Sequence, residues 1–177
     1  MRQRREALLQ RPNEMQEETN GIIRRYVYPV LTRQHIPLEW RYDFNPATNP
    51  CCMERIGFNA TMNSGALKWN GKYLMVVRVE GADRKSFFAI AESLTGWTIS
   101  TFGNVRWYCP MWIRRKPMCM ICVLPLTRMD GFMVSFAANA MMTGTGGDLS
   151  AAVAKAGIVR TRNLVDWERL PDLKAAS

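Results

Sequence analysis

A group of charged side chains follows an apolar stretch near the middle of the chain, and its residue types could bind a polar ligand. Tyr73 to Val77 is continuously apolar, and Arg78, Glu80, Asp83 and Lys85 come at its end or just beyond it. Guanidinium, carboxylate and ammonium groups hydrogen-bond sugar hydroxyls or phosphate oxygens. The same group is also typical of a solvated turn, in which Arg78 forms an ion pair with Glu80 or Asp83.

A predicted β-hairpin positions these charges. Ala66 to Trp69 and Tyr73 to Val79 resemble strands, and they flank Asn70-Gly71, a dipeptide that favours a tight turn with positive φ at both central positions. Ser86 to Glu92 is apolar and predicts the next strand. The charged group is therefore expected where one strand of a sheet ends and the next begins.

The N-terminal part predicts a helix followed by a strand and an aromatic loop. We expect residues 1–19 to form a helical arm, interrupted near Pro12, with a short apolar stripe and a solvated charged face. Tyr26 to Leu31 predicts a first strand, and the prolines of Ile36 to Pro46 argue against regular structure there. The loop's aromatic side chains could stack on a sugar ring or cover the edge of the core, and the second role is favoured; they are Trp40, Tyr42 and Phe44.

The C-terminal part predicts further antiparallel strands. Ala151 to Arg160 contains a strand, and Asn163 to Glu168 predicts a turn before another. The succession of strands and turns indicates repeated antiparallel sheets.

Composition limits the class of protein. The chain has 177 residues, of which 47% are hydrophobic and 22% charged, values typical of one globular domain. No apolar run approaches the roughly 20 residues of a membrane helix, and the N-terminus has no apolar centre, so we expect a cytoplasmic protein without a membrane partner. Five scattered cysteines and a single histidine, His35, do not form a zinc motif, so no metal site is expected.

Residues 94–143 differ in composition from both flanks. This stretch has five basic residues but one acidic residue, and it contributes +4 to a net charge of +9. It also holds seven of the twelve methionines and three of the five cysteines. Cations alternate with tryptophans between Arg106 and Lys116, which would suit a basic module that binds single-stranded nucleic acid. That alternative requires the stretch to be genuine protein sequence.

Three long blocks of the chain resemble glycoside hydrolase family 130, and within it the mannosylglucose phosphorylases. The blocks are IPLEWRYDFNPATNPCCMERIGFNATMNSGA, GKYLMVVRVEGADRKSFFAIAES and GDLSAAVAKAGIVRTRNLVDWERLPDL. They cover most of residues 20–93 and 144–174. The resemblance implies an all-β chain: the helical arm, then the N-terminal part of a five-bladed β-propeller over residues 20–177.

The resemblance also implies an activity. Family members of this kind phosphorolyse 4-O-β-D-mannosyl-D-glucose to α-mannose 1-phosphate and glucose, with inorganic phosphate as co-substrate and no metal or organic cofactor. Hydrolysis of β-mannosides, or phosphorolysis of mannooligosaccharides, is the alternative within the family. Full-length members form homo-oligomers, and no nucleic acid is implied as a partner.

The resemblance assigns part of a sugar site. Asn63 and Ser64 in NATMNSGA, and Arg78 in VVRVEG, match positions that hydrogen-bond mannose in the family. Glu80, Asp83 and Lys85 are weaker candidates on the same rim. Amide, hydroxyl and guanidinium groups suit vicinal sugar hydroxyls.

The family's catalytic acid has no counterpart in this chain, and an altered reading frame explains why. Lys116 to Val123 requires the codons AAR CCN ATG TGY ATG ATH TGY GTN, and reading from each third base permits the family motif Thr-Asn-Val-Tyr-Asp-Met-Arg. The same shift permits family-like stretches on both sides, GLDNFHFWKCP and HEDGWIYGVFCSERHDDG. The aspartate codon straddles Met120 and Ile121, whose side chains donate no proton near neutral pH. We therefore expect no catalytic residue in this chain, which by itself would be an inactive gene fragment.

Overall fold

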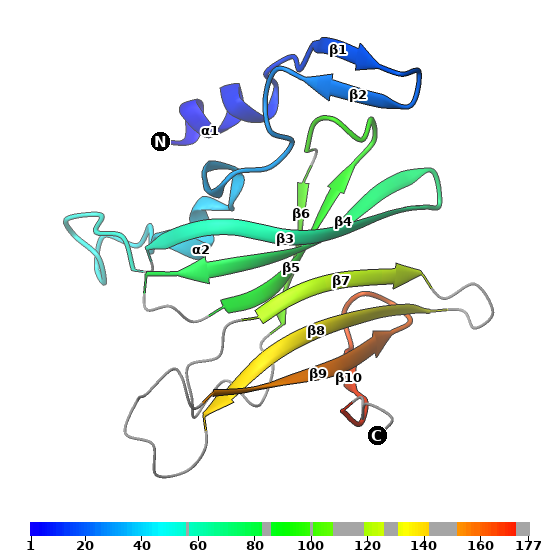
Figure 1. Ribbon diagram of the computed structural model, residues 1–177. Helices are drawn as coiled ribbons and strands as arrows, with labels where there is room; N and C mark the ends of the chain where they lie inside the picture. Colours follow the sequence, from blue (N-terminus) through cyan, green and yellow to red (C-terminus); the bar gives the residue numbers. More distant parts are fainter. Residues whose placement is uncertain are drawn as a thin grey trace, which may run out of the picture.

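The chain forms two four-stranded antiparallel sheets and a separate two-stranded hairpin (Figure 1). The computed structural model describes residues 1–55, 57–82, 86–99, 101–107, 119–125, 131–141 and 152–172. The first sheet has the strand order β3-β4-β5-β6, the second β10-β9-β8-β7, and β1 pairs with β2. The elements are α1 (Arg2–Leu9), β1 (Met15–Thr19), β2 (Ile23–Tyr26), η1 (Arg33–His35), α2 (Leu38–Arg41), β3 (Phe58–Trp69), β4 (Lys72–Gly81), β5 (Ser86–Ser93), β6 (Thr101–Trp107), β7 (Cys119–Pro125), β8 (Phe132–Met141), β9 (Ala152–Thr161) and β10 (Glu168–Arg169). The all-β expectation is thus confirmed.

The predicted hairpin is confirmed, and its turn has the expected backbone. Trp69 pairs with Lys72, so the connection between β3 and β4 has two residues. Asn70 has φ 47° and Gly71 has φ 76°, the positive values that a two-residue turn requires to match the twist of the strands. The strands predicted at 86–92 and 151–160 are also present, as β5 and β9.

Gly71→Ala is expected to destabilise the chain by about 1 kcal/mol, because alanine resists a positive φ. A Cβ at Gly71 would have no atom within 4 Å, so backbone strain alone would act. Gly103→Ala is the matched control, since φ there is not in the positive range and a Cβ would make only ordinary contacts, at 3.7 Å from Ile90. Urea denaturation of both variants measures the difference, and equal midpoints would contradict the assigned turn.

The central strands of the first sheet, β4 and β5, are largely buried on both faces, and alternate residues of β4 contribute to two different cores. Leu74 and Val76 pack with residues of β5 and of the second sheet, among them Phe132, Val134 and Val159. Val77 and Val79 point to the other face, where Ile36 of the N-terminal segment covers them. The period of two along a strand produces this division. The face that carries Leu74 and Val76 therefore lies between the two sheets.

The N-terminal helix is shorter than predicted. Helix α1 ends at Leu9, and the expectation of a helix to residue 19 is wrong for residues 15–19, which form β1. Pro12 cannot donate a backbone hydrogen bond, and the side chain of Asn13 donates to the carbonyls of Tyr28 and Trp97 and accepts from the Tyr28 amide. These bonds fix the chain in a non-helical course.

The charges that suggested a solvated helix instead face each other across the N-terminal hairpin. Glu17 pairs with Arg25, and Glu18 with Arg24, in the ladder between β1 and β2. Opposite charges in such positions stabilise a strand pair modestly. The first strand predicted at 26–31 is also displaced, because β2 ends at Tyr26.

The aromatic loop contains a helical turn, α2, contrary to the prediction of no regular structure. Trp40 lies on this turn, and its ring packs edge-on against Phe87 at 5.8 Å and Phe102 at 5.7 Å between centroids. Of the two roles considered for this side chain, covering the core is therefore the one observed.

His35 is buried and serves as a hydrogen-bond acceptor, so acid is expected to destabilise the fold. The Thr32 amide donates to its Nδ1 at 3.0 Å, and burial lowers the pKa of His35 below 6.5, aided by the positive charges of Arg11 and Arg5. A group whose pKa is lowered in the folded state contributes stability above its unfolded pKa. That stability is lost as the pH falls from about 6.5 through the folded value.

Urea denaturation at pH 7.5 and pH 5 measures this effect. His35→Asn keeps an acceptor near the Nδ1 position but does not titrate, so its denaturation midpoint is expected to fall less than that of the parent chain. An equal fall of the denaturation midpoint in His35→Asn and in the parent chain would contradict the role assigned to His35.

Parts of residues 94–143 contribute backbone to both sheets. Strand β6 pairs with β5, and β7 pairs with β8 over seven residues. The described residues contain no helix that is long and apolar enough to cross a membrane.

Candidate functional site

Arg78 and Glu80 are buried inside a strand, and they do not lie in a solvated turn. Strand β4 continues to Gly81, two residues beyond the predicted end. The exposed fraction is 4% for Arg78 and 8% for Glu80. Their even-numbered positions place them on the face of β4 that also carries Leu74 and Val76. The prediction of a solvated rim is thus wrong for these two residues, because the second sheet covers that face.

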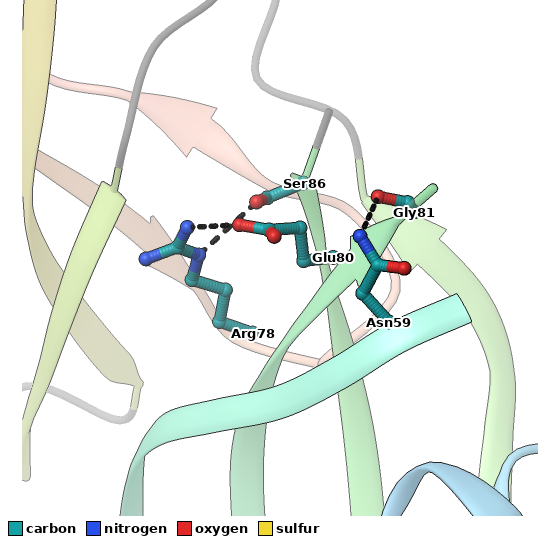
Figure 2. Close-up of polar contacts among 5 residues, drawn as sticks. All are labelled: Asn59, Arg78, Glu80, Gly81 and Ser86. Atoms are coloured by element: carbon teal, nitrogen blue, oxygen red, sulfur yellow. Dashed lines mark hydrogen bonds and ion pairs between the residues drawn. The ribbon is translucent and has the colours of Figure 1, made fainter. Parts of the chain in front are cut away.

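Arg78 and Glu80 form an ion pair, as one reading of the sequence predicted. Nη2 of Arg78 donates to Oε2 of Glu80 at 2.8 Å, and Nε of Arg78 donates to Oγ of Ser86 at 3.0 Å (Figure 2). Ser86 stands directly opposite Glu80 in the ladder between β4 and β5. The strand register therefore brings all three polar side chains together on one buried face.

A bulge in β3 places Asn63 and Ser64 beside this group. Met62 pairs with Arg78 and Gly65 pairs with Val76, so Asn63 and Ser64 together oppose the single residue Val77. A bulge re-aims the side chains of the strand and is common next to binding sites. Ser64 is exposed, and Asn63 belongs to the same irregular segment. The structure thus brings the Asn63-Ser64 backbone next to Arg78.

Two further residues contribute to this end of the sheet and were missed from the sequence. Ser86 accepts the hydrogen bond from Arg78, and Nδ2 of Asn59 donates to the carbonyl of Gly81 at 3.2 Å. Asn59 occupies a second irregularity of β3, between Phe58 and Ala60. The available signal was a polar residue next to phenylalanine at the start of a strand, Asn59 after Phe58 and Ser86 before Phe87.

Two predicted site residues cannot be compared with the geometry. Asp83 and Lys85 lie outside the described residues, in the connection between β4 and β5. The basic module proposed for 106–116 also falls largely outside them, and only the backbone of Arg106 and Trp107 belongs to a described strand, β6.

The second sheet approaches the site through β7. Figure 1 shows β7 beside the first sheet, and β7 contacts β3, the strand that carries Asn63 and Ser64. Met120 and Ile121, where the altered-frame hypothesis places the aspartate codon, are the second and third residues of β7. An aspartate encoded there would therefore stand on the strand that contacts β3.

A polar cavity opens at the same end of the first sheet. Its volume is about 400 Å³, and its lining includes Asn59 but none of Arg78, Glu80 and Ser86. The other lining residues are Arg33, Gln34, Arg41, Glu54, Gly57 and Phe58. Within the described residues, no group of His, Cys, Asp and Glu side chains could hold a metal ion.

Comparison with known proteins gives one extensive match. No family model matches the chain. A 4-O-β-D-mannosyl-D-glucose phosphorylase from Bacteroides fragilis is 54% identical over 182 residues, covering 97% of this chain. The chain spans 44% of that relative's length. A crystal structure of a candidate glycoside hydrolase from Bacteroides ovatus has a TM-score of 0.48 and 18% identity, over 89% of this chain and 40% of the other. Over nearly its whole length, this chain is therefore similar to part of a mannosylglucose phosphorylase.

Proposed function

We propose that this chain is part of a β-mannoside phosphorylase. The whole protein would cleave 4-O-β-D-mannosyl-D-glucose with inorganic phosphate to give α-mannose 1-phosphate and glucose, without a metal or organic cofactor. The observation that carries this proposal is the 54% identity over 97% of the chain. At that identity and coverage, the alignment includes the residues that form the candidate site.

The sheet topology supports two adjoining blades of a five-bladed propeller. Each blade of a propeller is a four-stranded antiparallel sheet, and the blades surround a central channel. The two sheets here are consecutive four-stranded meanders, and their first strands, β3 and β7, are in contact. The remaining blades would come from the part of the protein that this chain does not span.

The geometry supports a mannose pocket at the end of the first sheet. Asn63 and Ser64 lie in the bulge that adjoins Arg78, and an amide, a hydroxyl and a guanidinium can hydrogen-bond vicinal hydroxyls together. Asp83 and Lys85 would extend the same rim. In this proposal Arg78 contacts mannose while its guanidinium also binds Glu80 and Ser86.

The chain as it stands would bind sugar without cleaving it. Cleavage requires a general acid to protonate the glycosidic oxygen while phosphate attacks the anomeric carbon. A single carboxylate suffices, because phosphate is already ionised and needs no base. In this proposal the aspartate codon is divided between Met120 and Ile121, so neither residue supplies the acid. The proposed activity therefore belongs to the full-length product read in the other frame.

The test uses that frame-restored, full-length protein with mannosylglucose and phosphate. Mannose 1-phosphate and glucose are expected in equal amounts, and omission of phosphate is expected to abolish cleavage. Release of free mannose without phosphate would assign hydrolysis instead. Turnover of mannooligosaccharides in preference to mannosylglucose would assign the other phosphorylase activity.

A further inference from the structure

The guanidinium of Arg78 is held by two partners from its own sheet. Glu80 lies two residues along β4 on the same face, and Ser86 lies diagonally across on β5. Both distances, 2.8 Å to Glu80 and 3.0 Å to Ser86, are those of good hydrogen bonds. Figure 2 shows the guanidinium turned towards both side chains. Two contacts to a planar group fix the orientation of its plane.

Stability alone does not account for this ion pair. On the same face of β4 and β5, Leu74, Val76, Phe88 and Ile90 pack against the second sheet and separate this buried pair from the exposed Lys72–Glu92 pair at the other end. A buried ion pair commonly contributes no more to stability than apolar residues of similar volume, because both charges lose their hydration. The placement of a charged pair in this apolar row therefore indicates that the guanidinium has a task.

The neighbouring bulge indicates what that task is. Met62 is the partner of Arg78 in the ladder, and the bulge residues Asn63 and Ser64 follow Met62 directly. The long side chain of a free arginine samples many rotamers, and a ligand that binds it must first order it. Because Glu80 and Ser86 already restrain the side chain of Arg78, a ligand does not have to order it on binding.

We propose that Glu80 and Ser86 are positioning residues, which hold the Arg78 guanidinium in the orientation that binds mannose. The proposal rests on the proposed function and changes the role of Glu80 from a sugar ligand to a support for one. It predicts that substitutions of Glu80 and Ser86 change the kinetic constants for every substrate that contains mannose and for no other substrate.

The test measures four substrates with the frame-restored, full-length protein. Ser86→Ala and Glu80→Gln are expected to lower kcat/KM about tenfold or more for mannosylglucose and for mannose 1-phosphate, since each weakens a hydrogen bond to a charged group. The KM values for phosphate and for glucose are expected to stay within about twofold of the parent. Ser86→Thr keeps the hydroxyl and is expected to recover most of the loss.

A matched control separates positioning from general loss of charge. Glu92→Gln removes the same charge from the same sheet, where Glu92 binds Lys72 at 2.9 Å in an exposed pair, and it is expected to leave all four substrates unaffected. A double-mutant cycle gives the decisive result: in an Arg78→Gln background, Ser86→Ala is expected to have no further effect on kcat/KM.

Two results would overturn the proposal while leaving the proposed function intact. One is a full effect of Ser86→Ala or Glu80→Gln in the Arg78→Gln background, which would show that these residues act on the sugar directly. The other is an equal loss of kcat/KM for all four substrates together with a lower Tm, which would show a purely structural role. Absence of turnover by the parent protein would instead overturn the proposed function and this proposal with it.

Discussion

The 177-residue chain, incubated with 4-O-β-D-mannosyl-D-glucose and phosphate, is expected to release no detectable mannose 1-phosphate. The expectation rests on the altered-frame hypothesis, in which the codon of the general acid is divided between Met120 and Ile121, whose side chains donate no proton near neutral pH. General acid catalysis alone contributes about 10²- to 10⁴-fold to a rate. The chain also spans only 44% of the relative's length, so any residues supplied by the remainder are missing too. Chromatographic or coupled assay of mannose 1-phosphate measures the outcome.

The decisive comparison is between two full-length proteins that differ at one residue. The frame-restored product is expected to be active, whereas the same product with its restored aspartate changed to asparagine is expected to lose about 10²-fold or more of that activity. This pair keeps length and fold constant, so the difference reports the acid alone. Enzyme-like turnover by the 177-residue chain would contradict the assignment.

The coding DNA provides an independent check on the altered frame. Its codons for residues 94–143 are expected to spell the family motif Thr-Asn-Val-Tyr-Asp-Met-Arg when read from the third base. Codons that do not permit this motif would make the stretch a genuine insert. In that case the alternative of a basic binding module between Arg106 and Lys116 would gain support.

Local signals predicted the first sheet well, because its structure depends on short-range chemistry. Asn70-Gly71 favours a two-residue turn in almost any context, and both residues have the positive φ that such a turn requires. The run from Tyr73 to Val77 is apolar on both faces, and the strand it forms is covered on both faces. Here the local preference and the tertiary packing agree.

Elements whose structure depends on distant partners were predicted less well. The charges of β1 resemble those of a solvated helix, and only their pairing with Arg24 and Arg25 across the hairpin identifies a strand. Arg78 and Glu80 look like the residues of an exposed turn, and they are buried because the second sheet lies over their face. In each case the deciding contact comes from a separate strand or sheet, which local sequence patterns do not reveal.

The same distinction applies within the candidate site. The resemblance of the sequence to a known family suggested Arg78, Asn63 and Ser64 as sugar ligands, but it did not indicate what holds Arg78. Ser86 became part of the site only through the register of β5 against β4, which sets it opposite Glu80. Register is determined by the whole sheet, so a supporting residue of this kind requires a structure to be found.

Replacement of Arg78 by alanine is expected to lower the free energy of unfolding by about 3–5 kcal/mol. The side chains of Arg78 and Glu80 are 5% and 11% exposed, so the variant would leave the Glu80 carboxylate buried without its cation. Lys72→Ala is the control from the same sheet. The side chain of Lys72 is 51% exposed in its pair with Glu92, and an exposed pair contributes only about 0–1 kcal/mol. Urea denaturation of the two variants measures both values.

Because apolar residues can replace a buried ion pair without loss, the double variant Arg78→Met with Glu80→Leu is expected to regain most of the stability that Arg78→Ala loses. A stable double variant that no longer binds mannose would separate the two roles of the pair, since it would keep the packing of the sheet and remove the guanidinium. A loss below about 1 kcal/mol for Arg78→Ala would instead show that water reaches Glu80, and that the ion pair is not enclosed between the sheets.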